Sequence, residues 1–201
     1  MTLIAAPAYP AALNDAEIAV AQSKLDARAG GVVGHLLFEG LAAAMASARR
    51  ASFSPNAAVD ARILREEGAA PALTPVIAKR LTDWFATAAQ RDHVKFLFSP
   101  DHLEAVNELS LSTGSGSETL RVDRTFVTAS GERWVIDFKF SEPSPADKPS
   151  EWIAIEIEHY RPQLRGYVQA LRAWDESRGT PRPVVAALYF PWLDRLVRVE
   201  V

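Results

Sequence analysis

The sequence predicts a mixed α/β fold with an N-terminal helical region and a central sheet flanked by helices. Apolar residues recur at helical spacing through most of residues 15–85. The pattern then changes to alternation, which predicts strands near 105–112, 119–127 and 133–140 and again over 184–190 and 196–201. A further helical pattern, around 162–174, lies between these two groups of strands.

Two helices are expected first. Asn14 followed by Glu17 forms a capping-box pattern, which predicts that a helix starts near residue 15 and runs to about 29. Gly30 and Gly31 then separate it from a second helix, whose apolar residues between Val32 and Leu41 lie at helical spacing.

Two more helices complete the helical region. Asn56 is the candidate cap of the third, which is expected to end at Gly68. Pro75 marks the first turn of the fourth, where its missing N–H costs little. The apolar stripe of this helix consists of Ile77, Leu81, Trp84 and Phe85. By the same reasoning Pro162 is expected in the first turn of the later helix, after a loop at 141–150.

The strands near 119–127 and 133–140 carry the most informative residues of the chain. They flank a turn-like stretch centred on Ser130, and Asp123 and Asp137 are equidistant from it, so a symmetric hairpin would place the two carboxylates opposite each other. Asp137 and Lys139 share one face of their strand, and the opposite face is apolar, with Trp134, Ile136, Phe138 and Phe140. Like charges repel at cross-strand distance, and a divalent cation such as Mg²⁺ or Mn²⁺ would reverse that penalty.

Composition narrows the class of protein. The chain has 201 residues, 48% of them hydrophobic, which suits one domain with a substantial core. It has no cysteine, so disulfides, zinc-thiolate sites and cysteine-held iron–sulfur clusters are excluded, and a cytoplasmic location is expected. The opening residues lack a basic leader, and no uninterrupted apolar run reaches the length of a membrane helix. The net charge of −3 argues against a protein that captures nucleic acid by its overall charge.

Five segments, taken together, resemble the nuclease module of the RecB and AddA helicase-nucleases, a branch of the PD-(D/E)xK superfamily. In order along the chain they are 31–39 (GVVGHLLFE), 107–109 (NEL), 120–124 (LRVDR), 134–139 (WVIDFK) and 160–167 (YRPQLRGY). The resemblance implies a restriction-endonuclease-like fold over a single domain, 1–201, with a mainly helical part at 1–92 and an α/β core at 93–201. Because it has no cysteine, the chain resembles the AddA-like branch more than the relatives that hold an iron–sulfur cluster.

The resemblance also implies roles for individual residues. His35, Asp123, Asp137 and the backbone carbonyl of Phe138 would hold Mg²⁺, with Mn²⁺ as the alternative, and Lys139 would act beside them in catalysis. Glu108 is a further acidic candidate, for a second metal or a metal-bound water. Gln163 and Tyr167, four residues apart on one helix face, would organise the site or bind the DNA strand.

Arginines are the candidate DNA contacts. Arg121, beside Asp123, and Arg161 and Arg165, in the arginine-rich C-terminal part, would supply them, although charged helix surfaces have the same composition. The chain has no Gly-x-x-x-x-Gly-Lys-Ser/Thr loop, so no nucleotide-binding motif is present. The resemblance implies that a helicase motor, in the same parent polypeptide or a partner subunit, would deliver DNA during double-strand-break repair and recombination.

Simpler interpretations compete with each of these roles. The acidic residues could be solvated charges on an open sheet face, His35 could be a packed or solvated histidine, and Tyr167 could be a core aromatic beside a surface glutamine. At the level of the whole chain, the alternative is a non-catalytic module that keeps the nuclease fold to dock a helicase or to grip DNA.

Overall fold

The computed structural model describes residues 15–46, 53–112 and 119–201 of the chain. Along the chain, these residues form α1 (Asp15–Ala46), α2 (Ala57–Glu66), α3 (Thr74–Ala88), α4 (Asp92–Leu97), β1 (Leu103–Ser112), β2 (Thr119–Val127), β3 (Arg133–Phe138), α5 (Pro149–Ser177), β4 (Val184–Phe190), the 3₁₀ helix η2 (Pro191–Leu193) and β5 (Arg195–Val199). The predicted mixed α/β fold with an N-terminal helical region is confirmed.

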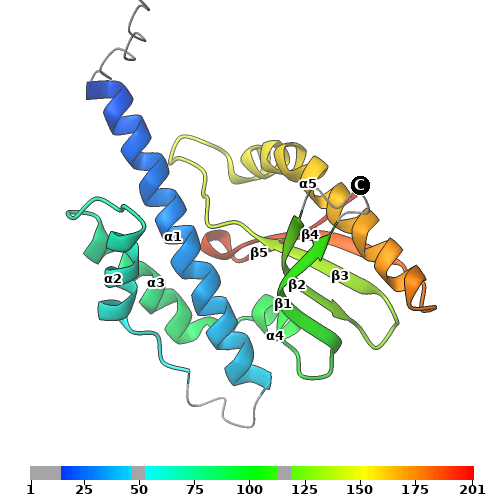
Figure 1. Ribbon diagram of the computed structural model, residues 1–201. Coiled ribbons are helices and arrows are strands. Elements are labelled where there is room, and N and C mark those ends of the chain that lie inside the picture. Colours follow the sequence, from blue (N-terminus) through cyan, green and yellow to red (C-terminus); the bar gives the residue numbers. More distant parts are fainter. Residues whose placement is uncertain (1–14, 47–52, 113–118) are drawn as a thin grey trace, which may run out of the picture.

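A five-stranded sheet in the order β1-β2-β3-β4-β5 forms the centre of the molecule (Figure 1). β3 and β4 pair in parallel, and the other neighbouring strands pair antiparallel. α5 is the crossover between the two parallel strands, as a parallel connection requires. The sheet is therefore mixed, and β2 and β3 form its central hairpin.

Each face of the sheet carries its own core. On one face, α5 packs Leu164, Val168 and Leu171 against Val135 and Leu188 of the sheet. On the other, the N-terminal helices pack a cluster that includes Leu37, Phe38, Leu81 and Phe85 against Trp134, Ile136 and Phe138. Figure 1 shows the same arrangement, with α5 on one side of the sheet and α1 to α3 on the other. Alternation along β3 thus buries both faces of that strand.

Two predicted helix boundaries are wrong. α1 continues through Gly30 and Gly31 as one helix, because its apolar stripe continues on both sides, with Ala29, Val33 and Leu37 all in the core. The later helix begins at Pro149 and not near Pro162, which lies inside it. The short helix α4 was not predicted. The other local signals are confirmed, since Asn56 accepts hydrogen bonds from the N–H groups of Ala58 and Val59, and α3 begins at Thr74.

The predicted cap at Asn14 lies outside the described residues. Within them, one helix is long and apolar enough, by length and composition, to cross a membrane, and it is α1 over Ala19–Ala46. The sequence expectation considered only uninterrupted apolar runs, which this alanine-rich segment avoids. Of that helix's apolar window, 44% is buried inside the protein, as in a helix that packs one side on the core.

Candidate functional site

Three carboxylates lie in a row across three neighbouring strands. The β2–β3 register pairs Arg124 with Ile136, so the next position places Asp123 opposite Asp137, as the symmetric hairpin predicted. The β1–β2 register, with Asn107 opposite Arg124, places Glu108 opposite Asp123. The central residue, Asp123, therefore has an acidic neighbour on each side.

The regular alternation of side chains between the two faces of β2 is interrupted at this row. In an uninterrupted strand Val122 and Arg124 would share a face, but Val122 packs in the core beneath α5 while Arg124 donates to the carbonyl of Leu97 at the end of α4. Glu108, across from Asp123, has a φ of +52°. Such a conformation costs a non-glycine residue about 1–3 kcal/mol and is concentrated at functional sites. Asp123 Oδ2 accepts a hydrogen bond from the N–H of Phe138, 2.7 Å away, where the β2–β3 ladder ends.

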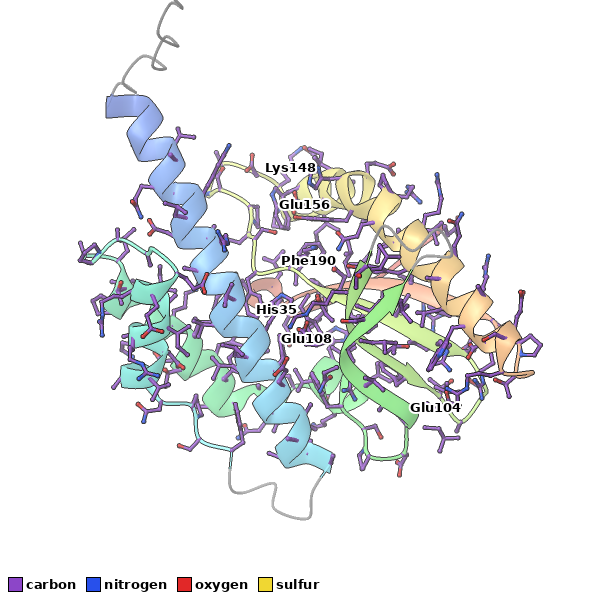
Figure 2. The ribbon with its side chains drawn as sticks, in the orientation of Figure 1. His35, Glu104, Glu108, Lys148, Glu156 and Phe190 are labelled. Carbon is purple, nitrogen blue, oxygen red and sulfur yellow. The ribbon has the colours of Figure 1, made fainter. Side chains whose placement is uncertain are left out.

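α1 supplies His35 to the same point. Its Nδ1 lies 3.3 Å from Glu108 Oε1 and 3.6 Å from Asp123 Oδ1, and Figure 2 shows His35 and Glu108 meeting between the helix and the sheet. The preceding residue explains the close approach, since a Cβ on Gly34 would lie 2.2 Å from the Phe140 ring. His35 packs its ring against Phe138 and Phe140.

His35, Glu108 and Asp123 each offer a ligand atom within 4.8 Å of the others. Asp137 is not one of this group, although the sequence placed it in the ligand set. It lies beside the group, where Gln163 of α5 contacts it, and its charge raises the pKa of Asp123. The predicted convergence of His35 and Asp123 is therefore present in the geometry, and Glu108 is closer to them than the sequence indicated.

Burial makes both aspartates hard to ionise. Asp137 is 1% exposed and Asp123 is 9% exposed. Removal from water raises the pKa of Asp123 well above its usual range, and the neighbouring Asp137 charge raises it further. Burial also raises the pKa of Asp137, against the opposing effect of Lys139. Solvated charges on an open sheet face do not have these properties, so that simpler interpretation does not describe the site.

The two oxygens of Asp137 have different surroundings. Oδ1 accepts a hydrogen bond from Gln163 Nε2 at 3.2 Å. Oδ2 lies 2.6 Å from Lys139 Nζ, and this contact lowers the pKa of Asp137 against the effect of burial.

Gln163 and Tyr167 connect α5 to both central strands. Gln163 donates to the Tyr167 hydroxyl as well as to Asp137, and Tyr167 donates in turn to the carbonyl of Arg121 at 2.7 Å. Burial and the nearby charge of Asp137 raise the pKa of Tyr167, which keeps it a neutral donor. The pair is thus placed to organise the site, and Tyr167 is also a core side chain, as its simpler interpretation held.

The candidate arginines do not converge. Arg121 pairs with Glu108 through Nε. Arg161 pairs with Glu158 and donates to the carbonyl of Glu200 near the end of β5. Arg165 is exposed on α5. Of these three, Arg121 is therefore the one in contact with the acidic row.

A cleft of about 390 Å³ opens at the row, between α1 and the β1–β2 edge of the sheet. Its lining residues are Arg28, Gly31, Val32, His35, Leu36, Glu39, Glu108, Arg121 and Asp123. Sequence reasoning did not select Arg28, Leu36 or Glu39. Spacing could have found Arg28 and Glu39, because they lie two turns before and one turn after His35 on the same helix, whereas Leu36 is its direct neighbour in sequence.

The donor set fits a hard divalent cation. Glu108 and Asp123 supply carboxylate oxygens and His35 supplies an imidazole nitrogen, which are ligands for Mg²⁺ or Mn²⁺. Asp137 Oδ2, which contacts Lys139, is a further carboxylate oxygen beside this group. No protein-family model matches the chain, and no curated protein matches it, so the resemblance to helicase-nucleases stays a prediction.

Proposed function

We propose that this chain is a metal-dependent nuclease module that hydrolyses phosphodiester bonds in DNA, on a restriction-endonuclease-like fold. The observation that carries the proposal is the row Glu108, Asp123 and Asp137, in which both aspartates are buried and Glu108 and Asp123 line a cleft. Three carboxylates at cross-strand distance repel one another, and a divalent cation is the simplest group that stabilises all three.

The residues divide into ligands and neighbours. Asp123, Glu108 and His35 would hold the cation, joined by Asp137 through Oδ2 and by the Phe138 carbonyl. When bound, such a cation polarises a phosphate and lowers the pKa of water. Lys139 supplies a positive charge 2.6 Å from Asp137, where it can neutralise charge that develops on the phosphate. Gln163 fixes the orientation of Asp137 through its second oxygen.

A helicase motor would supply the substrate strand. The net charge of −3 and the scattered arginines suit a module to which DNA is delivered. The cleft, with Arg28 and Arg121 among its lining residues, is the candidate path of the strand. Processing of double-strand breaks is the corresponding cellular role, and the motif resemblance is what supports it.

The test is cleavage of linear single- and double-stranded DNA with and without Mg²⁺. We expect cleavage that requires Mg²⁺ and that falls by about 10²-fold or more in Asp137→Ala and Lys139→Ala, the range for loss of a group that stabilises a transition state. Asp83→Asn is the matched control, because it removes a carboxylate from an exposed ion pair on α3. It should cleave like the wild type.

Two results would contradict the proposal. Equal cleavage by all variants would indicate a contaminating nuclease. No cleavage by the wild type, combined with unchanged Mg²⁺ binding in Asp123→Asn, would leave the non-catalytic docking module as the better account. Calorimetric titration of Mg²⁺ into the wild type and Asp123→Asn supplies the second measurement.

A further inference from the structure

Lys139 contacts a group that the roles above do not use. Its Nζ lies 3.8 Å from the centroid of the Tyr160 ring, as well as 2.6 Å from Asp137 Oδ2. Its side chain is 16% exposed, so the ammonium is largely removed from water. An ammonium over an aromatic face is attracted by the negative face of the ring, and the attraction is stronger where water is excluded.

Tyr160 lies on α5, three residues before Gln163, so the two side chains lie on neighbouring parts of one helix face. Gln163 binds Asp137 and Tyr160 contacts Lys139. The same stretch of α5 therefore contacts both Asp137, near the end of β3, and Lys139, just after it. Tyr160 is half-buried against the core beneath α5, which fixes its ring.

We propose that Tyr160 is a positioning residue that keeps the Lys139 ammonium at the site once Asp137 binds a cation. The inference rests on the proposed nuclease function. Asp137 Oδ2 is the oxygen in contact with Lys139, and a divalent cation on that oxygen would take its place and repel the ammonium. A lysine has a long flexible stem, and without a second contact its ammonium would move into solvent. The Tyr160 ring provides a contact that does not depend on Asp137.

The alternative role of Tyr160 is packing alone, and substitutions of matched shape separate the two. Phenylalanine keeps the aromatic face, and tryptophan strengthens the attraction between that face and the ammonium. Leucine keeps apolar volume but has no aromatic face. In Mg²⁺-dependent cleavage of single-stranded DNA, we expect Tyr160→Phe to stay within about twofold of the wild-type kcat, because the face is retained. Tyr160→Leu should lower kcat between about twofold and thirtyfold while KM changes little. The kcat of Tyr160→Trp should be higher than that of Tyr160→Leu.

Trp152→Leu is the matched control on the same helix. Trp152 is half-buried and packs against Phe190, so its loss weakens the core beneath α5 without touching Lys139. It should lower the Tm and leave the kcat of the folded protein unchanged. An equal loss of kcat in Trp152→Leu and Tyr160→Leu would overturn the positioning role, as would an equal loss in Tyr160→Phe.

A second measurement does not need activity. Lys139→Met, Tyr160→Leu and the double variant form a thermodynamic cycle, read from thermal unfolding without metal. We expect the two changes to be non-additive, because they remove one shared contact, and additive changes would overturn the inference. A wild type that cleaves DNA and needs Lys139 but not the Tyr160 ring would end this inference alone. A wild type without Mg²⁺-dependent cleavage would end the proposed function and the positioning role with it.

Discussion

Asp123 is a buried carboxylate whose surroundings disfavour its ionised form. It lies between two other carboxylates. Its Oδ2 accepts a hydrogen bond from the backbone N–H of Phe138. Burial and the Asp137 charge raise its pKa, so the ionised form costs stability at neutral pH. In the absence of metal, Asp123 is therefore a source of instability, and a bound cation would offset that cost.

Replacing Asp123 with asparagine should stabilise the metal-free protein. The amide oxygen can still accept from Phe138, while the charge is removed. We expect Asp123→Asn to have the higher Tm at pH 8 in EDTA by a few degrees, since about 1 kcal/mol shifts the Tm of a chain of this size by about 2–4 °C. Differential scanning calorimetry from pH 4 to pH 8 measures the difference.

The pH dependence of that difference follows from the raised pKa. The cost of ionised Asp123 is fully present above its raised folded pKa and disappears as the pH falls toward the ordinary value of 3.8. The advantage of Asp123→Asn should therefore shrink on acidification. Groups such as Glu104 and Glu142, whose pKa values are lowered by their arginine partners, are common to both proteins and cancel. An advantage that grows at low pH would contradict the assignment.

Two glycines of α1 give a matched pair for the position of His35. A Cβ on Gly34 would overlap the Phe140 ring, whereas one on Gly31 meets nothing within 4 Å. Gly31→Ala should stabilise the helix by about 0.5–1 kcal/mol, because alanine is the better helix former. Gly34→Ala should destabilise by about 1–3 kcal/mol through overpacking and should displace His35. Urea unfolding of both variants tests this, and equal effects would mean that α1 does not depend on Gly34 to approach the sheet.

Residue patterns predicted part of the site and missed the rest for a physical reason. The sequence could place Asp123 opposite Asp137, with Lys139 beside Asp137, because strand alternation and hairpin symmetry are local. The strain at Glu108, the change of face at Asp123 and the Tyr160 ring over Lys139 depend on how β1 and α5 meet the hairpin. No spacing within a single segment encodes those contacts.

At the scale of elements, the helix boundaries show where local rules fail. Two adjacent glycines cost a helix about 2 kcal/mol together, yet α1 continues because its stripe packs on the core from Ala29 to Leu41. Pro162 removes an internal hydrogen bond of α5, and the core beneath α5 offsets that loss. The rule that proline suits a first helical turn was correct, but it applies to Pro149.

The far end of α5 is fixed by a buried ion pair. Arg133, the first residue of β3, donates through two nitrogens to the two oxygens of Asp175 at 2.7 Å each, and neither side chain is exposed. Glu104 and Arg182 extend the network at the start of β1 and before β4. It lies at the opposite end of β3 from Asp137, so α5 is held at both ends of the strand.

Breaking this pair should weaken the whole α5 layer. We expect Asp175→Asn to destabilise the protein by about 3–5 kcal/mol, because it leaves the Arg133 guanidinium buried with reduced compensation. Glu158→Gln, which removes the partner of Arg161 on the exposed face of α5, should be close to neutral. Denaturant unfolding followed by circular dichroism compares the two, and similar losses would show that burial of the pair does not decide its contribution.

At the scale of the whole molecule, the negative charge of the chain and of its cleft opposes the binding of DNA. The net charge is −3, and the cleft that would receive the strand is lined by Glu39, Glu108 and Asp123 as well as by Arg28 and Arg121. Phosphates are repelled from such a cleft until a cation neutralises its carboxylates. The isolated chain should therefore bind single-stranded DNA weakly, in keeping with delivery by a motor.

Two variants of equal net charge separate the effect of charge in the cleft from the effect of total charge. In EDTA and low salt, Asp123→Asn and Asp83→Asn both change the net charge from −3 to −2, but only the first removes a charge from the cleft. If the carboxylate row controls access, Asp123→Asn should bind single-stranded DNA several times more tightly than Asp83→Asn, as measured by fluorescence anisotropy. Equal affinities would place the DNA path elsewhere on the surface. Submicromolar binding by the wild type at physiological salt, without metal or partner, would show that the module captures DNA by itself and would contradict delivery.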